Sequence, residues 1–224
     1  MEILITSKTH KGKAACVGGL VLSNKRFVRL LNPGNWDQYA DTDLDVGDVW
    51  DIHFADRADT QPPHVEDIII QNQSYVRDIG DISSYLRNSG VRIYNGEPTQ
   101  IFGGRLKWTG IGSGFIGSRE NLPENSVGFW ISDENLELDD DGKHYNYPSE
   151  SPFSVQKRFK YVGFEETIPV IPAGTLMRVS LARWWKPEDV EIEERCYLQL
   201  SGWYIIKSPP KPNLLDDIID DLPF

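Results

Sequence analysis

The apolar residues of this chain are gathered in short runs rich in β-branched and aromatic side chains, and this pattern most constrains its fold. Gly, Asn, Pro and Asp separate the runs, as expected for strands joined by turns. In the first half, the pattern predicts strands over 2–7, 14–22, 26–31, 49–54 and 65–76. In the second half, it predicts strands over 127–132, 153–161, 175–181 and 196–206. The chain is therefore expected to be an all-β protein.

Helical patterns are short and rare in this sequence. Residues 81–88 contain Ser83, Ser84, Tyr85 and Leu86 and precede Gly90, so we expect a short helix that ends there. Residues 103–117 hold six glycines and are predicted to form a loop or a pair of bulged strands.

The strands divide into two successive sets. Five strands are enough for one small barrel, and two such sets predict tandem Greek-key barrels of the oligonucleotide/oligosaccharide-binding (OB) kind. We expect a first OB-like barrel with its short helix over 1–95 and a second OB-like barrel over 96–206. Residues 207–224 are expected to form a proline-rich spacer and a disordered acidic tail.

The composition indicates a folded chain. Of 224 residues, 39% are hydrophobic, and seven Trp, nine Tyr and nine Phe are too many aromatic residues for an unfolded protein. No apolar run approaches the ~18 residues of a membrane span, and the N-terminus lacks the pattern of a secretory signal. We therefore expect a soluble, cytoplasmic protein without a membrane partner. In a reducing compartment, Cys16 and Cys196 are predicted to be two buried thiols rather than a disulfide.

The net charge of −11 is unevenly distributed along the chain. Residues 1–36 hold six basic residues against one acidic residue, whereas acidic residues are concentrated in 37–51, 133–141 and 188–194. Such segregation lets one basic face bind phosphates while the remaining surface repels them. The acidic balance therefore does not exclude a nucleic-acid ligand.

Segments 105–108, 156–161 and 183–186 alternate basic and aromatic residues. Single-strand binding uses cations along the phosphate backbone and ring faces on which bases stack. The candidate nucleic-acid-binding residues in these segments are Arg105, Trp108, Arg158, Phe159, Lys160, Tyr161 and Trp184. Strand alternation places Arg158 and Lys160 on one face and both Phe159 and Tyr161 on the other. Burial of Phe159 in the core remains open, because aromatic residues in β barrels are mostly core residues.

Residues 7–12 are predicted to form a turn between the first two strands. OB folds place their binding loop L12 at this position. Lys8 and Lys11 are therefore candidate phosphate contacts. The alternative is a solvated hairpin loop, because lysine is common at sheet edges.

The body of the chain also resembles a known family. The similar segments are Ile3–His10, Val28–Leu31, Gly47–Trp50, Pro62–Asp67, Leu181–Trp185 and Glu194–Trp203. Together they resemble the dual OB-fold domain family of prokaryotes. This resemblance implies two OB folds and a role in sensing or holding nucleic acid in mobile-element conflict or DNA metabolism, but it implies no catalytic residues.

The C-terminus has the composition of a docking peptide formed by Asp220, Asp221, Leu222, Pro223 and Phe224. Its free carboxylate, aromatic ring and aspartates suit a partner with basic groups beside an apolar pocket. This ending resembles the C-terminal tip of bacterial single-stranded DNA-binding proteins, which implies that replication and repair proteins bind it. The alternative is a short amphipathic helix that packs on its own domain, with an apolar stripe of Leu214, Leu215, Ile218, Ile219 and Leu222. The three prolines of 207–213 favour a spacer that holds the tip away from the body.

Patterns typical of enzymes or metal sites are missing from the sequence. Four scattered histidines and two separate cysteines give no zinc spacing, so we assign no catalytic residue, metal site or cofactor. We expect a non-enzymatic protein that binds single-stranded DNA or RNA and recruits DNA replication and repair proteins through its tip. One alternative is a protein-interaction or regulatory module of a prokaryotic conflict, defence or mobile-element system, whose body binds a protein or small ligand. Another is a nuclease with carboxylates among 37–51.

Overall fold

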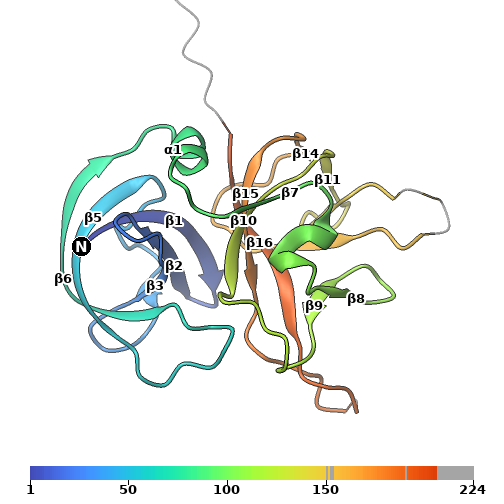
Figure 1. Ribbon diagram of the computed structural model, residues 1–224, viewed down its shortest axis with the longest axis horizontal. Coiled ribbons are helices and arrows are strands. Elements are labelled where there is room, and N and C mark those ends of the chain that lie inside the picture. The colour runs from blue at the N-terminus through green and yellow to red at the C-terminus, as the bar shows by residue number, and fades with distance from the viewer. Residues whose placement is uncertain (150, 152–153, 190, 206–224) are drawn as a thin grey trace, which may run out of the picture.

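The computed structural model describes residues 1–149, 151, 154–189 and 191–205, which form two β units side by side (Figure 1). The elements of the first unit are β1 (Glu2–Lys11), β2 (Ala14–Val21), β3 (Phe27–Leu31), β4 (Gln38–Tyr39), β5 (Asp48–Asp56), β6 (Asp67–Asp78) and α1 (Ile82–Asn88). The later elements are β7 (Ile93–Asn95), η1 (Pro98–Gly103), β8 (Lys107–Trp108), β9 (Gly114–Ile116), β10 (Val127–Ile131), β11 (Leu136–Leu138), β12 (His144–Asn146), β13 (Arg158–Tyr161), β14 (Val170–Ile171), β15 (Leu176–Leu181) and β16 (Cys196–Tyr204). The expected all-β class is confirmed.

The first unit is a closed five-stranded barrel. Its strands follow the order β1-β5-β6-β3-β2, and β2 pairs with β1 to close the ring, while β4 adds to the edge of β2. The pairing of β3 with β6 is parallel, and the other pairings in the ring are antiparallel. Alternate residues point inward, so Ile3, Ile5, Val17, Leu30 and Ile52 fill the barrel.

The second unit is a ten-stranded sheet around its own core. Eight strands follow the order β14-β11-β12-β13-β16-β15-β10-β7, and β8 and β9 join through β16. Trp130, Tyr145 and Phe159 are completely buried at its centre. The glycine-rich segment 103–117, expected to form a loop or a pair of strands, contributes the paired strands β8 and β9.

A shared apolar cluster holds the two units together. Leu4 and Leu20 of the barrel, Leu86 of α1, and Phe129 and Leu176 of the second unit belong to this cluster. Since Ile3 and Ile5 point into the barrel while Leu4 points out of it, β1 is buried on both faces. The continuous apolar run of β1 follows from this double burial.

Helix α1 begins after Asp81, as the sequence predicts. The Asp81 carboxylate accepts a hydrogen bond of 2.9 Å from the Ser84 N–H and satisfies a free donor of the first turn. Leu86 points into the contact between the two units, and Gly90 follows with a φ of +79°. The helix therefore occupies part of the seam between the two units (Figure 1).

Two expectations about segments need correction. Residues 7–11 continue β1 instead of forming a turn, because Thr9 pairs with Cys16 and Lys11 with Ala14. The loop between β1 and β2 is thus limited to residues 12–13. The strand β7 pairs with β10 of the second sheet, although its residues fall within the range expected for the first barrel.

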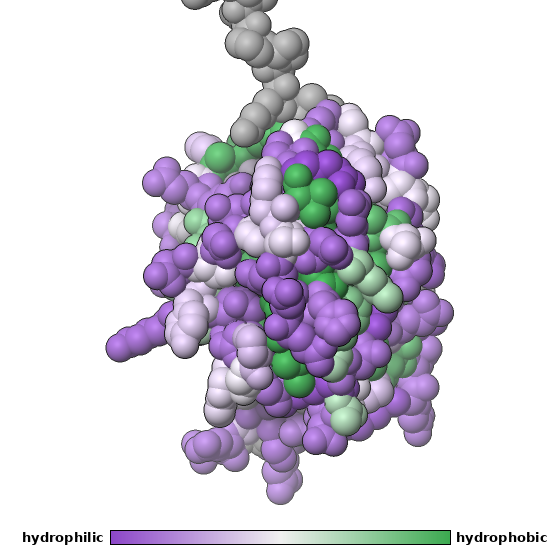
Figure 2. All heavy atoms as spheres, turned by 90° about the vertical axis from the view of Figure 1, so that its left-hand side faces the viewer, coloured by the Kyte–Doolittle hydropathy of each residue, from purple (hydrophilic) through white to green (hydrophobic). Residues whose placement is uncertain are grey.

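The outer surface of the first barrel is mainly hydrophilic in the view of Figure 2, with small separate apolar spots. Within the described residues, none of the helices is long and apolar enough to span a membrane. The predicted tail, 207–224, lies outside the residues that the structure describes.

Candidate nucleic-acid interface

A cavity of about 240 Å³ lies between the two units. On the barrel side, its walls come from the outer faces of β2 and β3, where Gly18 and Arg29 are neighbours in register. On the other side, Arg178 and Ser180 of β15 face the cavity, while Met177 and Val179, which alternate with them, point into the second core. The cavity therefore occupies the strand 2–3 face that OB folds use to bind oligonucleotides.

Asp67 is the centre of an ion-pair cluster in this cavity. It is 2% exposed, and its carboxylate lies 2.6 Å from Arg29, 3.1 Å from Arg57 and 3.0 Å from Arg183. Burial alone would raise the pKa of Asp67, but the hydrogen bonds and charges of Arg29 and Arg183 outweigh burial and lower this pKa. The carboxylate therefore stays charged and joins strands of the barrel to the second unit.

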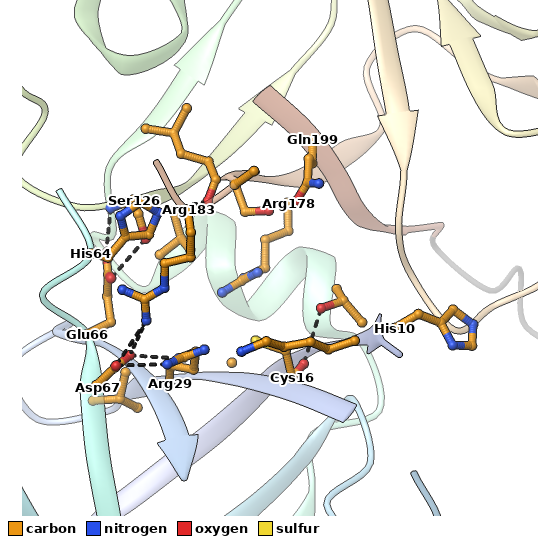
Figure 3. Close-up of a pocket in the computed structure, with 18 residues that line it drawn as sticks. His10, Cys16, Arg29, His64, Glu66, Asp67, Ser126, Arg178, Arg183 and Gln199 are labelled. Atoms are coloured by element: carbon orange, nitrogen blue, oxygen red, sulfur yellow. Dashed lines mark hydrogen bonds and ion pairs between the residues drawn. The ribbon is translucent and has the colours of Figure 1, made fainter. Parts of the chain in front are cut away.

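Glu66 makes a second polar junction between the units. Its carboxylate accepts hydrogen bonds of 2.5 Å from the N–H of Ser126 and 2.9 Å from the hydroxyl of Ser126. Burial raises the pKa of Glu66, although the two hydrogen bonds from Ser126 act in the opposite direction. This side chain is fully occupied and holds the wall of the cavity in place (Figure 3).

His64 lies at the same junction and stays neutral. Its Nε2 is 3.1 Å from the Leu181 carbonyl oxygen, and the residue is 5% exposed. Burial and the nearby Arg183 charge lower the pKa of His64 to about 4. A neutral ring with its proton on Nε2 donates to this carbonyl and connects the barrel to β15.

Arg178 differs from the other arginines of the cavity. The residue is 4% exposed, and burial lowers the pKa of its guanidinium. In the part of the chain that the structure describes, its Nε has no hydrogen-bond partner, and no carboxylate forms an ion pair with it. Figure 3 shows Arg178 pointing into the space between the units, while Arg29 and Arg183 both converge on Asp67.

The lining carries a surplus of positive charge. Lys11, Arg29, Arg178 and Arg183 face two carboxylates, those of Glu66 and Asp67. Cys16 also lines the cavity and is partly exposed, so the expectation of two buried thiols is correct only for Cys196. Both cysteines are free thiols, as expected.

Two exposed aromatic rings flank Asp37, a residue that contacts the cavity lining. Trp36 is 75% exposed and Tyr39 is 74% exposed. Between them in the sequence, the Asp37 carboxylate contacts Lys11 at 2.7 Å and Arg29 at 3.3 Å, and both cations line the cavity. Neither ring belongs to a segment that alternates basic and aromatic residues, although both follow shortly after the basic segment 1–29.

The two lysines of β1 that were expected to contact phosphate, Lys8 and Lys11, pair with groups of the protein itself. The ammonium of Lys8 donates to the Thr42 carbonyl at 2.6 Å and contacts the Asp45 carboxylate at 3.0 Å. Lys11 is paired with Asp37 but is half exposed at the edge of the cavity. Of these two lysines, only Lys11 lines the candidate site.

The basic and aromatic alternation of β13 is confirmed, but it does not make a stacking surface from Phe159. Phe159 is completely buried and stacks on Trp130 with ring centroids 5.3 Å apart. Arg158 contacts Asp139 at 2.5 Å and Asp141 at 2.9 Å, whereas Lys160 is exposed. The proposal of a base stacked on Phe159 is therefore replaced by a core role.

The remaining predicted residues are dispersed. Tyr161 is partly buried against Trp203 and shares a separate cavity of about 300 Å³ with Lys8. Trp108 meets Phe159 edge-on at 6.1 Å, and Arg105 donates to the Phe102 carbonyl at 2.9 Å. The structure does not bring these residues together into one binding track.

Trp184 connects the two units close to the candidate cavity. Its indole N–H donates to the Pro62 carbonyl at 2.9 Å, and the Arg119 guanidinium lies 4.5 Å from its ring centroid. The neighbouring Trp185 is 55% exposed. Trp184 thus packs at the seam, next to the Arg183 of the cavity lining.

The family to which the sequence is similar agrees with the barrel architecture described above. The sequence matches the dual OB-containing domain over residues 1–203. The chain belongs to this dual OB-containing family. The comparisons of this chain with curated proteins and with solved structures found no match. Membership in the dual OB-containing family suggests nucleic-acid or ligand binding, and in this chain the OB strand 2–3 face of the first barrel opens on the arginine cavity.

Metal ligands are not grouped in this site. Among the described residues, no group of three or more His, Cys, Asp or Glu side chains is placed to hold a metal ion. The chemistry offered by the site is thus binding of an anion by guanidinium groups, together with stacking on the exposed rings.

Proposed function

We propose that this dual OB-containing protein binds single-stranded nucleic acid without catalysing a reaction on it. The observation that supports this function best is that two exposed rings, Trp36 and Tyr39, flank Asp37, which contacts two cations of a cavity with surplus positive charge. Cations attract the phosphates, and each base stacked on an exposed ring contributes about 1–3 kcal/mol to binding. Both contacts are available on the strand 2–3 side of the first barrel.

The proposed path of the strand follows the edge of the barrel. Bases stack on Trp36 and Tyr39, the backbone passes the exposed Lys11 and Lys13, and a phosphate reaches the arginine cavity. Phosphate oxygens replace the Asp37 carboxylate near Lys11 at little cost, because Lys11 is half exposed and such ion pairs are weak.

We further propose that the C-terminal residues 220–224 recruit DNA replication and repair proteins. The free carboxylate of Phe224, its ring and the preceding aspartates are the chemistry that supports this role. The proposal rests on the sequence, since these residues lie outside the described part of the chain.

Fluorescence anisotropy with labelled single-stranded oligonucleotides tests the binding function. Trp36→Ala together with Tyr39→Ala should weaken affinity by about 1–3 kcal/mol per lost stack, with the melting temperature unchanged because both rings are exposed. Tyr75→Ala is the matched control, since this ring is 54% exposed but lies on β6, away from the cavity. Equal affinities for the double variant and the wild type would contradict the proposed surface.

A second function is favoured by the position of the cavity between the two units. The second unit covers the strand 2–3 face, and many cations outside the cavity are paired with carboxylates, for example Arg26 with Asp56 and Arg77 with Glu2. A regulatory module of a prokaryotic conflict, defence or mobile-element system, with a small anionic ligand in the cavity, fits this arrangement. Absence of oligonucleotide binding at low salt, combined with thermal stabilisation by a mononucleotide, would favour this second function.

A further inference from the structure

In the described part of the chain, Arg178 is a buried cation that forms no ion pair, and this condition requires a physical explanation. Removing a charged group from water is costly unless an opposite charge or hydrogen bonds compensate. Among the described residues, the Nε of Arg178 has no acceptor, and the Glu66 carboxylate acts on it only at longer range. The cavity therefore holds a guanidinium that no carboxylate of the described residues contacts directly.

The surrounding residues leave room for this guanidinium. Gly18 lies opposite it on β2, and a Cβ at that position would overlap Nη2 of Arg178. The φ of Gly18 does not lie in the left-handed region, so close approach is the reason for glycine here. Gln199 lines the same space and offers a further hydrogen-bond donor, while the Ser180 hydroxyl of the lining is hydrogen-bonded to the Ser201 hydroxyl at 2.6 Å.

The volume of the cavity limits what can enter. About 240 Å³ corresponds to ~8 water molecules at liquid density. Sites for drug-sized ligands usually measure about 300–1,000 Å³. The cavity thus has room for a phosphate with its attached sugar or one small nucleotide, but not for several nucleotides.

The units are also joined too closely for a strand to lie across the cavity. Asp67 contacts Arg183, Glu66 contacts Ser126, and the Tyr204 hydroxyl donates to the Thr6 carbonyl. The His64 ring contacts the Leu181 carbonyl at 3.1 Å at the same junction. An internal phosphate would need space for chain on both of its sides, whereas a strand end needs space on only one side.

We infer that the Arg178 cavity binds the terminal phosphate of a nucleic-acid strand. This inference rests on the proposed nucleic-acid function and names its ligand more narrowly. A terminal phosphate carries a charge of about −1.5 to −2 at neutral pH, and an internal phosphodiester carries only one negative charge. Arginine suits this anion because its planar fork donates two parallel hydrogen bonds to phosphate oxygens.

Anisotropy with one oligonucleotide sequence in four forms tests this inference. The forms carry a 5′-phosphate, a 3′-phosphate, hydroxyl groups at both ends, or a closed circle. We expect one phosphorylated form to bind about tenfold or more tightly than the hydroxyl and circular forms, as for a charged hydrogen-bonded contact. Equal affinities of all four forms would overturn the inference while leaving the proposed function standing. No binding of any form would remove the proposed function and the inference together.

Variants assign the effect to Arg178. Arg178→Met should reduce the ratio of affinities for the phosphorylated and hydroxyl forms to near one. Arg77→Met is the control and should keep the wild-type ratio, because Arg77 lies near the end of β6 in an exposed ion pair with Glu2. Gly18→Ala is a second variant. The added Cβ should push the Arg178 guanidinium aside, because this group ends a flexible side chain, and the preference for the phosphorylated end should also fall. A preference that survives in both Arg178→Met and Gly18→Ala would overturn the assignment.

A stability measurement distinguishes a ligand-binding role from a structural role. Because the Nε of Arg178 has no hydrogen-bond partner among the residues that the structure describes, Arg178→Met should keep or raise the melting temperature, and it should abolish stabilisation by a nucleoside monophosphate. Inorganic phosphate is the second probe, and it should protect the wild type less than the nucleoside monophosphate does. A lower melting temperature of Arg178→Met, with the nucleotide stabilisation intact, would show that the side chain is structural.

Discussion

Asp67 of β6 and Arg183, which follows β15, form an ion pair of 3.0 Å between residues 116 positions apart in the sequence. The pair fixes the second unit against the outer face of the first barrel. Because Asp67 also binds Arg29 and Arg57, one buried carboxylate compensates three guanidinium groups. The geometry of the arginine cavity therefore depends on this carboxylate.

Replacing Asp67 should destabilise the protein strongly. Asp67→Asn removes the carboxylate that Arg29, Arg57 and Arg183 share, although Arg29 also pairs with Asp37, and breaking a buried ion pair costs about 3–5 kcal/mol. Urea denaturation measures this loss in the free energy of unfolding. Asp56→Asn is the matched control, because its pair with Arg26 is exposed and such pairs contribute about 0–1 kcal/mol. Equal losses for the two variants would contradict the central role of Asp67.

Stability should fall in mildly acidic solution because of His64. Its pKa is about 4 in the folded protein and 6.5 in the unfolded chain, so the unfolded chain binds the additional proton between these values. The contribution of neutral His64 to the free energy of unfolding is fully present above pH 6.5 and is lost as the pH falls toward 4. The shift corresponds to about 3 kcal/mol. Arg183 and Arg29, the nearby cations, add to this effect by repelling a charged ring.

Denaturation curves at several pH values check this prediction. His64→Gln cannot titrate, so its stability should change less than that of the wild type between pH 6.5 and 4. His53→Gln, at an exposed position of β5, should retain the wild-type pH dependence. If His64→Gln and the wild type lose the same stability over this range, the pKa of His64 does not account for the loss.

The two adjacent residues Phe159 and Lys160 should respond differently to alanine. Phe159 is completely buried against Trp130, so Phe159→Ala should cost about 3–5 kcal/mol of unfolding free energy. Lys160 is exposed, and Lys160→Ala should change stability by less than about 0.5 kcal/mol. Thermal and urea unfolding measure both. A stable Phe159→Ala variant with weakened oligonucleotide binding would restore the stacking role expected from the sequence.

The sequence predicts the fold better than the site because strand patterns are local. Runs rich in β-branched and aromatic residues between turn residues identify β1, β2, β3, β5 and β6, which close the first barrel. The arginine cavity instead depends on how β15 faces β2, and this depends on the apolar cluster around Leu4 and Leu176. No local pattern shows that Lys8 is bound to Asp45, or that Arg178 is left without a carboxylate.

The short strands and the exposed rings were missed for different reasons. β4, with two residues, and β14, also with two, are too short to show an alternating pattern. Trp36 has no adjacent basic residue, so the alternation of cations and rings does not indicate it. Its relation to Lys11 arises only through Asp37 in the folded protein.

The C-terminal tip should bind its partners through its free end. Adding residues after Phe224 keeps the ring and every aspartate but moves the α-carboxylate, so capture of proteins that bind the tip of single-stranded DNA-binding proteins should be lost. Phe224→Ala should also abolish capture by emptying the apolar pocket of the partner. Pull-down with a purified repair helicase measures both changes, and oligonucleotide affinity should not fall in either variant. Unchanged capture by the extended chain would exclude recognition of the free carboxylate.

Alkylation of Cys16 tests the binding site most directly, since this thiol lines the cavity. Burial raises the pKa of the Cys196 thiol to about 12, so this second thiol stays protonated and unreactive in the folded protein. The rate of iodoacetamide alkylation at Cys16, read by peptide mass spectrometry, should fall in proportion to the fraction of protein that anisotropy shows to be bound to oligonucleotide. An unchanged rate at saturating oligonucleotide would place the bound strand elsewhere on the protein and contradict the assignment of the arginine cavity.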